Sequence, residues 1–151
     1  AMKNKLPIIS HWGIAGGNFV DRVGVANLNQ LDISVLQTYS FAKPSNQDKN
    51  TYVLDKYRQN YVENIQPLEV PGAVGTAHAY DLVHLLAQAI IAANSTDRAI
   101  IRDNLERLPL YDGLVKVYQP AFSAERHDAL LSGDYIMSTF NKDGNLVPIQ
   151  E

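Results

Sequence analysis

The residues best suited to act on a small molecule lie near the start of the chain. His11 and Trp12 follow an apolar run and lead into a turn that contains Gly13, Gly16 and Gly17. Open α/β sheets bind their ligands at the carboxyl ends of strands, which is where this turn is expected. The flat ring and single N–H donor of Trp12 suit stacking on a small organic ligand, and the alternative is that the ring packs into a core or its rim.

The glycine-rich turn could hold an anion on its free backbone N–H groups. Its spacing matches neither the Gly-x-Gly-x-x-Gly pattern nor a P-loop, and no Gly-Lys-Ser/Thr follows. A plain turn and a phosphate cradle are therefore both open, with the plain turn the simpler interpretation.

Catalytic and metal chemistry has little support in the sequence. The chain has no cysteine, no His-Glu-x-x-His pair and no Gly-x-Ser-x-Gly elbow. His78 and His84 are six residues apart, about 240° around a helix, so they cannot share a face. We expect no enzymatic activity, no metal and no cofactor. Hydrolytic or transferase chemistry at the glycine turn is the distant alternative, and it would require His11.

Length and composition restrict the class of protein. The 151 residues predict one domain or a large fragment of two, and 46% hydrophobic with 19% charged residues is typical of a globular chain. A net charge of −3 without any long basic run argues against a nucleic-acid partner. Ala1 before an apparent initiator Met2 indicates a cloning remnant, and no apolar signal segment follows. We therefore expect a piece cut from a longer protein.

Periodicity predicts a mixed α/β chain. The long helix predicted over residues 75–93 is apolar nearly all round, which predicts that it is mostly buried. Asp81, His84 and Gln88 form its polar stripe. Asp143-Gly144 predicts a hairpin turn, and Asn94 a left-handed helix end. The expected elements are a buried strand at 6–10, a short helix from Phe19, a strand at 33–39, a polar hinge at 42–50, helices at 51–64 (Val53, Tyr57 and Tyr61 inward), 75–93 and 97–108 (capped by Thr96), and strands at 114–118, 135–140 and 146–149.

The order of these elements and several local motifs resemble the C-terminal part of type I periplasmic solute-binding proteins, the leucine/isoleucine/valine-binding family that serves ABC transporters. The resemblance covers nearly the whole chain but less than half of such a protein. It is carried by Leu6-Pro7-Ile8-Ile9-Ser10-His11-Trp12-Gly13, Val35-Leu36-Gln37-Thr38-Tyr39, Ala79-Tyr80-Asp81, Arg126-His127-Asp128-Ala129-Leu130, and Tyr135-Ile136-Met137 followed by Asp143-Gly144.

The resemblance implies an α/β fold, as a fragment of a two-lobed protein whose lobes are three-layer α/β/α sandwiches. Family members hold their ligand between the lobes and close by a hinge. The implied division is a second-lobe segment at 1–39, a crossover at 40–50, first-lobe helices at 51–113, and strands returning to the second lobe at 114–151.

The resemblance also implies the binding residues. Trp12, with His11 and Gly13, would contribute from the second lobe, and His78 and Tyr80 from the opposite wall. Trp12 stands where amino-acid binders of the family place an acidic residue for the ammonium group. Either a cation–π contact with Trp12 partly replaces that ion pair for an amino-acid-like ligand, or, more simply, the solute is less zwitterionic, aromatic or apolar.

The implied function is the solute-binding component of an ABC transporter, which captures a small organic solute in the periplasm and passes it to a permease. A ligand-sensing regulatory or receptor domain on the same fold is the alternative. Because a fragment leaves apolar helix faces uncovered, the chain is also expected to form a homodimer.

Overall fold

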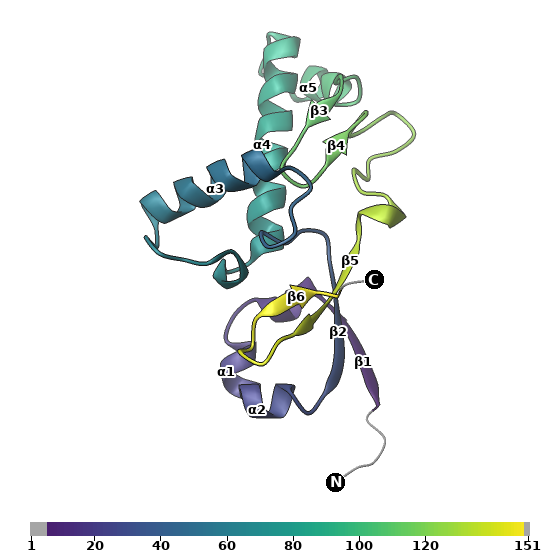
Figure 1. Cartoon of the computed structure of the whole chain (residues 1–151). Coiled ribbons are helices and arrows are strands. Elements are labelled where there is room, and N and C mark those ends of the chain that lie inside the picture. The colour runs from purple at the N-terminus through teal and green to yellow at the C-terminus, as the bar shows by residue number, and fades with distance from the viewer. Residues whose placement is uncertain (1–5, 150–151) are drawn as a thin grey trace.

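The computed structural model describes residues 6–149, and residues 1–5, considered above for a signal segment, lie outside them. The chain forms two bodies, which we call the sheet lobe and the helical lobe (Figure 1). The sheet lobe contains β1 (Pro7–His11), η1 (Trp12–Ala15), α1 (Phe19–Val23), α2 (Val25–Leu28), β2 (Asp32–Gln37), β5 (Ile136–Phe140) and β6 (Leu146–Pro148). The helical lobe contains α3 (Gln47–Asn60), η2 (Pro67–Glu69), α4 (Ala73–Ala93), α5 (Arg98–Leu105), β3 (Tyr111–Asp112) and β4 (Val117–Tyr118).

The sheet lobe is built on a four-stranded sheet in the order β1-β2-β5-β6. β1 runs parallel to β2, and the other pairs are antiparallel. The predicted turn at Asp143-Gly144 is confirmed: Gly144 has φ +85°, and a Cβ there would lie 2.8 Å from Val20 Cγ1. The core of this lobe joins strands to the short helices through Leu28, Ile33, Val35 and Phe140.

β1 forms where a strand was predicted, but the prediction that it is buried was wrong. Ile9 is 78% exposed, and Ile8 is exposed as well. In residues 6–149 the strand pairs only with β2, so its outer edge has no neighbour. An apolar strand must be packed against other residues, but its sequence does not show whether those residues belong to this chain segment.

α3 starts earlier than predicted because Asn46, rather than Thr51, caps it. The Asn46 side chain accepts a hydrogen bond from Lys49 N at 3.0 Å. Val53 is buried, as predicted, but Tyr61 is 76% exposed. Tyr61 follows the last helical residue with φ −131°, so it no longer continues the inward face.

The helical core forms around α3, α4 and the loop after β3. Its main cluster is Tyr39, Phe41, Val53, Leu54, Ile65, Val70, Ala77, Leu114 and Val115. A second cluster joins α4 to α5 through Leu85, Ala89, Leu108, Tyr118 and Ala121. The predicted strand at 114–118 is mostly a turn, since only Val117–Tyr118 is a strand and it pairs with β3. Leu114, Val115 and Tyr118 pack in the helical lobe.

α4 differs from its prediction on its apolar side. Asp81, in the predicted polar stripe, is 1% exposed, and it accepts hydrogen bonds from Leu114 N at 2.6 Å and Val115 N at 2.8 Å. The apolar pattern predicted burial of the opposite face, whereas the resemblance to a fragment implied uncovered apolar faces. The structure agrees with the second expectation, because only one side of the helix has protein against it. Its exposed apolar residues are Leu82, Val83, Leu86, Ile90 and Ile91.

The ends of α4 and α5 follow their caps. Asn94 adopts the predicted left-handed conformation, with φ 44°. Asp97, rather than Thr96, caps α5, because its Oδ1 accepts from Ala99 N at 2.9 Å and Ile100 N at 3.1 Å. α5 ends at Leu105, earlier than the predicted Leu108.

Two connections join the lobes within the described residues: one from β2 to α3, and one from β4 to β5 through η3 (Ser132–Asp134) (Figure 1). The first is fastened to the helical lobe, since Ser45 Oγ donates to Val115 O at 2.7 Å. Thr38 Oγ1 and His78 Nε2 are hydrogen-bonded at 2.8 Å. The buried apolar clusters of the helical lobe share no residue with the cluster of the sheet lobe, so the two lobes have separate cores with a boundary between them.

Candidate ligand-binding cleft

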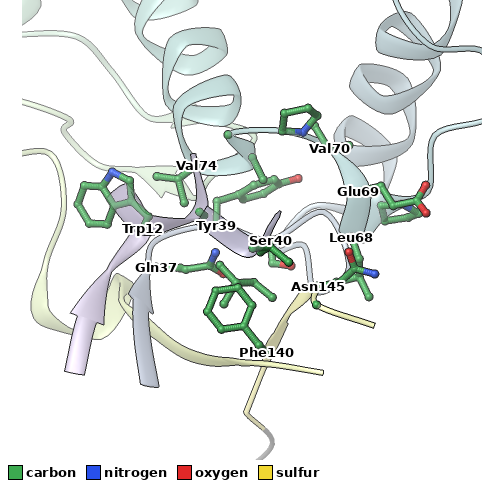
Figure 2. A pocket seen from close by; sticks show the side chains of 18 of the residues that line it. Trp12, Gln37, Tyr39, Ser40, Leu68, Glu69, Val70, Val74, Phe140 and Asn145 are labelled. Carbon is green, nitrogen blue, oxygen red and sulfur yellow. The ribbon is translucent and has the colours of Figure 1, made fainter. Parts of the chain in front are cut away.

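A cavity of about 310 Å³ lies between the two lobes. Figure 2 shows the side chains that converge on it from the ends of the strands and from the segment before α4. Its walls combine apolar side chains with polar groups in similar measure, and small-molecule sites use such polar groups to orient a ligand. The sheet lobe contributes Trp12, Ala15, Val20, Gln37, Phe140, Asp143, Gly144, Asn145 and Leu146, and the connection and helical lobe contribute Tyr39, Ser40 and residues 67–75.

The turn after β1 places Trp12 in this cavity. His11 Nδ1 accepts a hydrogen bond from Gly13 N at 3.0 Å, which starts η1. A Cβ at Gly13 would lie 2.6 Å from His11 Cε1, so a larger residue there would displace the imidazole ring. The Trp12 ring packs edge-on against His11, with centroids 5.5 Å apart, and stays 39% exposed. His11 and Gly13 thus hold the turn but do not line the cavity, whereas Trp12 does.

Two nearly buried polar side chains also reach the cavity. Gln37 is 5% exposed, and its Oε1 accepts a hydrogen bond from Ser138 Oγ at 3.0 Å. Ser40 is 4% exposed, and its Oγ accepts from Ala42 N at 3.3 Å. Within residues 6–149, neither the Gln37 Nε2 nor the Ser40 hydroxyl hydrogen has a protein acceptor.

The third polar feature of the cavity is the start of α4. Gly72 precedes the helix in the left-handed conformation, with φ 59°, and no side chain caps the first turn. Ala73, Val74 and Gly75 line the cavity. The first N–H groups of a helix have no partner within the helix, so these donors and the positive end of the helix dipole face the cavity.

Among the described residues that line the cavity, the charged ones are Glu69 and Asp143. Glu69 Oε2 accepts a hydrogen bond from Gln66 N at 2.9 Å, so one carboxylate oxygen of Glu69 already has a partner within the protein. Asp143 lies in the exposed turn before β6. No lysine or arginine of the described chain lines this space, and its strongest donors are neutral.

His78 and Tyr80 lie further along α4 and do not line the cavity. His78 faces the first connection through its bond to Thr38, and burial lowers the pKa of its imidazole, opposed in part by the nearby charge of Asp81. Tyr80 packs on His84, with centroids 4.4 Å apart, in a shallow groove between α3 and α4. Burial raises the pKa of Tyr80. The structure therefore brings only Trp12 of the predicted site residues into the cavity.

Sequence reasoning missed Gln37, Ser40 and Phe140. A signal for the first two was present, because Gln37 lies near the end of the predicted strand at 33–39 and Ser40 follows directly on it, and strand ends are where ligands bind in open sheets. Phe140 carries no such signal, since an aromatic residue at the end of a strand is typical of any core.

The described residues show neither a metal cluster nor a membrane-spanning helix. They contain no group of three or more His, Asp or Glu side chains arranged to hold a metal ion. None of the helices in residues 6–149 combines the length and the apolar character needed to cross a membrane.

Comparisons with known proteins rest on structure alone. No protein-family model matches the chain, and no curated protein sequence matches it. A periplasmic binding protein type 1 from Bordetella pertussis Tohama I superposes with a TM-score of 0.75 at 22% identity over 95% of this chain. The branched-chain amino acid transporter substrate binding protein LivJ from Streptococcus pneumoniae, in complex with isoleucine, superposes with a TM-score of 0.68 at 24% identity over 98% of this chain.

These similarities confirm the predicted fold class. The chain spans 39% of the length of each of the two structures, so it corresponds to part of a two-lobed protein. In the described residues, each lobe has one helical layer or one sheet with helices against it, rather than all the layers of a complete lobe. The chain has the fold of type 1 periplasmic binding proteins and represents about two fifths of such a structure.

Proposed function

We propose that this chain is part of a solute-binding protein that captures a small organic molecule between its lobes. The observation that carries the proposal is the cavity itself, which Trp12 lines from the sheet lobe and the start of α4 lines from the helical lobe. Both structural neighbours are binding proteins, and one of them is an amino acid transporter substrate binding protein in complex with isoleucine. We infer a periplasmic parent protein, an ABC permease as its partner, and binding without turnover.

The binding mechanism follows from the position of the cavity. Two chain segments connect otherwise separate cores, so a small rotation about them opens or closes the space between the lobes. Closure would move the Trp12 ring toward the start of α4 and remove the ligand's apolar surface from water. In this proposal Trp12 contacts the ligand, His11 and Gly13 fix its turn, and His78 acts at the hinge. Tyr80 faces away and is assigned no contact.

Trp12 provides a direct test because it is the only tryptophan of the chain. Its emission should change in a saturable way when leucine, isoleucine, phenylalanine or 3-phenylpropionate is titrated into the protein. Leu68→Ala, which removes part of the cavity wall, should weaken binding about five- to tenfold, since a loss of about 1–1.5 kcal/mol is expected for a few buried carbons.

Leu82→Ala is the matched control, since it makes the same change on an exposed face of α4 outside the cavity. It should leave the titration unchanged. If none of the four compounds gives a saturable change in the wild-type protein, or if both variants weaken binding equally, the proposed capture in this cavity is wrong.

A further inference from the structure

We infer that the cavity contains a carboxylate subsite formed by Gln37 Nε2, the Ser40 hydroxyl and the first backbone N–H groups of α4. The inference rests on the proposed function and adds the class of ligand. That class is a monocarboxylate with an apolar or aromatic body, for which an amino group is not required.

Gln37 is the strongest evidence for a ligand. Its side chain is 5% exposed, and its oxygen is already engaged by Ser138. In residues 6–149, every buried side-chain nitrogen or oxygen that is sealed from solvent has a hydrogen-bond partner. The unpaired Nε2 is therefore in contact with open space, and the space that Gln37 lines is the cavity. This donor is therefore free to bind an acceptor of a ligand in the cavity, which would take the place of water there.

Ser40 adds a second donor on the same wall. Its oxygen accepts from Ala42 N, which leaves the hydroxyl hydrogen free to donate. Because Ser40 is 4% exposed and lines the cavity, little bulk water reaches the hydroxyl except through that space. In Figure 2 its side chain lies between those of Gln37 and Asn145.

The start of α4 provides the third group of donors. α4 has 21 residues, so its dipole is fully developed, and no side chain caps the N–H groups of Ala73, Val74 and Gly75. Side-chain and backbone donors that converge on one space match a carboxylate, which accepts at two oxygens.

The charge of the lining limits the ligand to a single negative charge. No lysine or arginine of residues 6–149 lines the cavity, and the carboxylates of Glu69 and Asp143 already lie in its wall. A phosphate or a dicarboxylate would bring a second negative charge that these residues do not neutralise. The remaining wall, formed by Trp12, Val20 and Leu146, is apolar, so the body of the ligand is apolar or aromatic.

The test compares 3-phenylpropionate with 3-phenylpropionamide, which has the same body and no charge. The change in Trp12 emission should give an acid that binds about 10- to 100-fold more tightly than the amide, the range expected for hydrogen bonds to a charged group. Phenylalanine should bind no more tightly than 3-phenylpropionate, because no ammonium subsite is required.

Gln37→Glu removes the donor and keeps the acceptor for Ser138. It should weaken acid binding at least tenfold by like-charge repulsion and leave amide binding within about twofold. Gln59→Glu makes the same change on the exposed face of α3 and should alter neither. Ser40→Ala, a smaller change, should lower the acid-to-amide ratio about threefold or more, and it keeps the test valid if Gln37→Glu does not fold.

The outcomes separate the two proposals. Equal binding of acid and amide to the wild-type protein, or an unchanged ratio in Ser40→Ala, overturns the carboxylate subsite and leaves capture in the cavity intact. No saturable response to any compound overturns capture in the cavity and the subsite with it.

Discussion

Replacing Asp81 should unfold the helical lobe more readily than any surface change. The carboxylate is 1% exposed and accepts from Leu114 N, Val115 N and Tyr118 OH at 2.6, 2.8 and 3.0 Å. Burial, followed by the charge of Asp81, raises the pKa of Tyr118, so its hydroxyl remains a proton donor. A single side chain thus attaches the β3–β4 hairpin to the middle of α4.

The expected cost of Asp81→Ala follows from the donors left behind. Three buried donors lose their acceptor, and an unsatisfied buried donor costs about 1–3 kcal/mol. Removal of a buried charge returns part of this cost, because its desolvation penalty also disappears. We expect a net loss of about 3–5 kcal/mol, a large part of the roughly 5–15 kcal/mol that stabilises a typical domain.

Urea denaturation followed by far-UV circular dichroism measures this loss, since most helical residues belong to the helical lobe. Asp81→Asn keeps one acceptor oxygen and should fall between wild type and Asp81→Ala. Asp103→Ala is the control, because it removes an acidic residue paired with Arg102 at the surface, where such pairs are worth about 0–1 kcal/mol. An Asp81→Ala variant as stable as Asp103→Ala would refute this account of the hairpin.

Three further predictions concern pH, a turn and an exposed face. Burial holds the pKa of His78 below its usual 6.5, so the unfolded chain binds protons more readily and the free energy of unfolding should fall as pH drops through that value. His78→Gln should make this fall between pH 7.5 and 5.5 less steep. An equal slope in both proteins would contradict the prediction. Gly144→Ala should lower the midpoint of thermal unfolding more than Gly17→Ala does. Both residues have positive φ, but only at Gly144 would a new Cβ lie 2.8 Å from Val20. Equal losses in the two variants would exclude this contact as the cause. The exposed apolar face of α4 should drive self-association. In analytical ultracentrifugation, Leu86→Asp should therefore shift the sedimenting species toward monomer, and Tyr61→Asp should not. A wild-type chain that is monomeric at high micromolar concentration would refute this prediction.

The part of the site that could be predicted from sequence depends on local rules. The place of Trp12 in the cavity wall follows from its position after an apolar strand, because strand ends meet at one edge of an open sheet. The turn at Asp143-Gly144 follows from residues that tolerate positive φ. Both features are set by neighbours in the sequence, so no distant contact was needed to predict them.

The errors have a common physical origin in distant contacts. Helical periodicity places Asp81 in a polar stripe, but it does not identify the partners of the carboxylate, which are the backbone N–H groups of Leu114 and Val115, more than 30 residues away. His78 and Tyr80 lie within about two turns of the part of α4 that lines the cavity. The packing of α4 fixes its rotation about its own axis, and this rotation directs His78 to Thr38 and Tyr80 to His84 instead. Helical periodicity fixes which residues share a face and leaves open what that face meets.

The order of strands in the sheet has a consequence for how the chain is made. β2 lies between β1 and β5, and its partner Ser138 is 103 positions after Val35 in the chain. The helical lobe is formed by one continuous stretch, which can fold as soon as it leaves the ribosome. The sheet lobe must wait for β5, with β2 unpaired on one side until that strand has been made. Slow translation or a chaperone that shields β2 should therefore raise the yield of folded protein, and a chain stopped before residue 136 should keep its helical lobe and lose the cavity between the lobes.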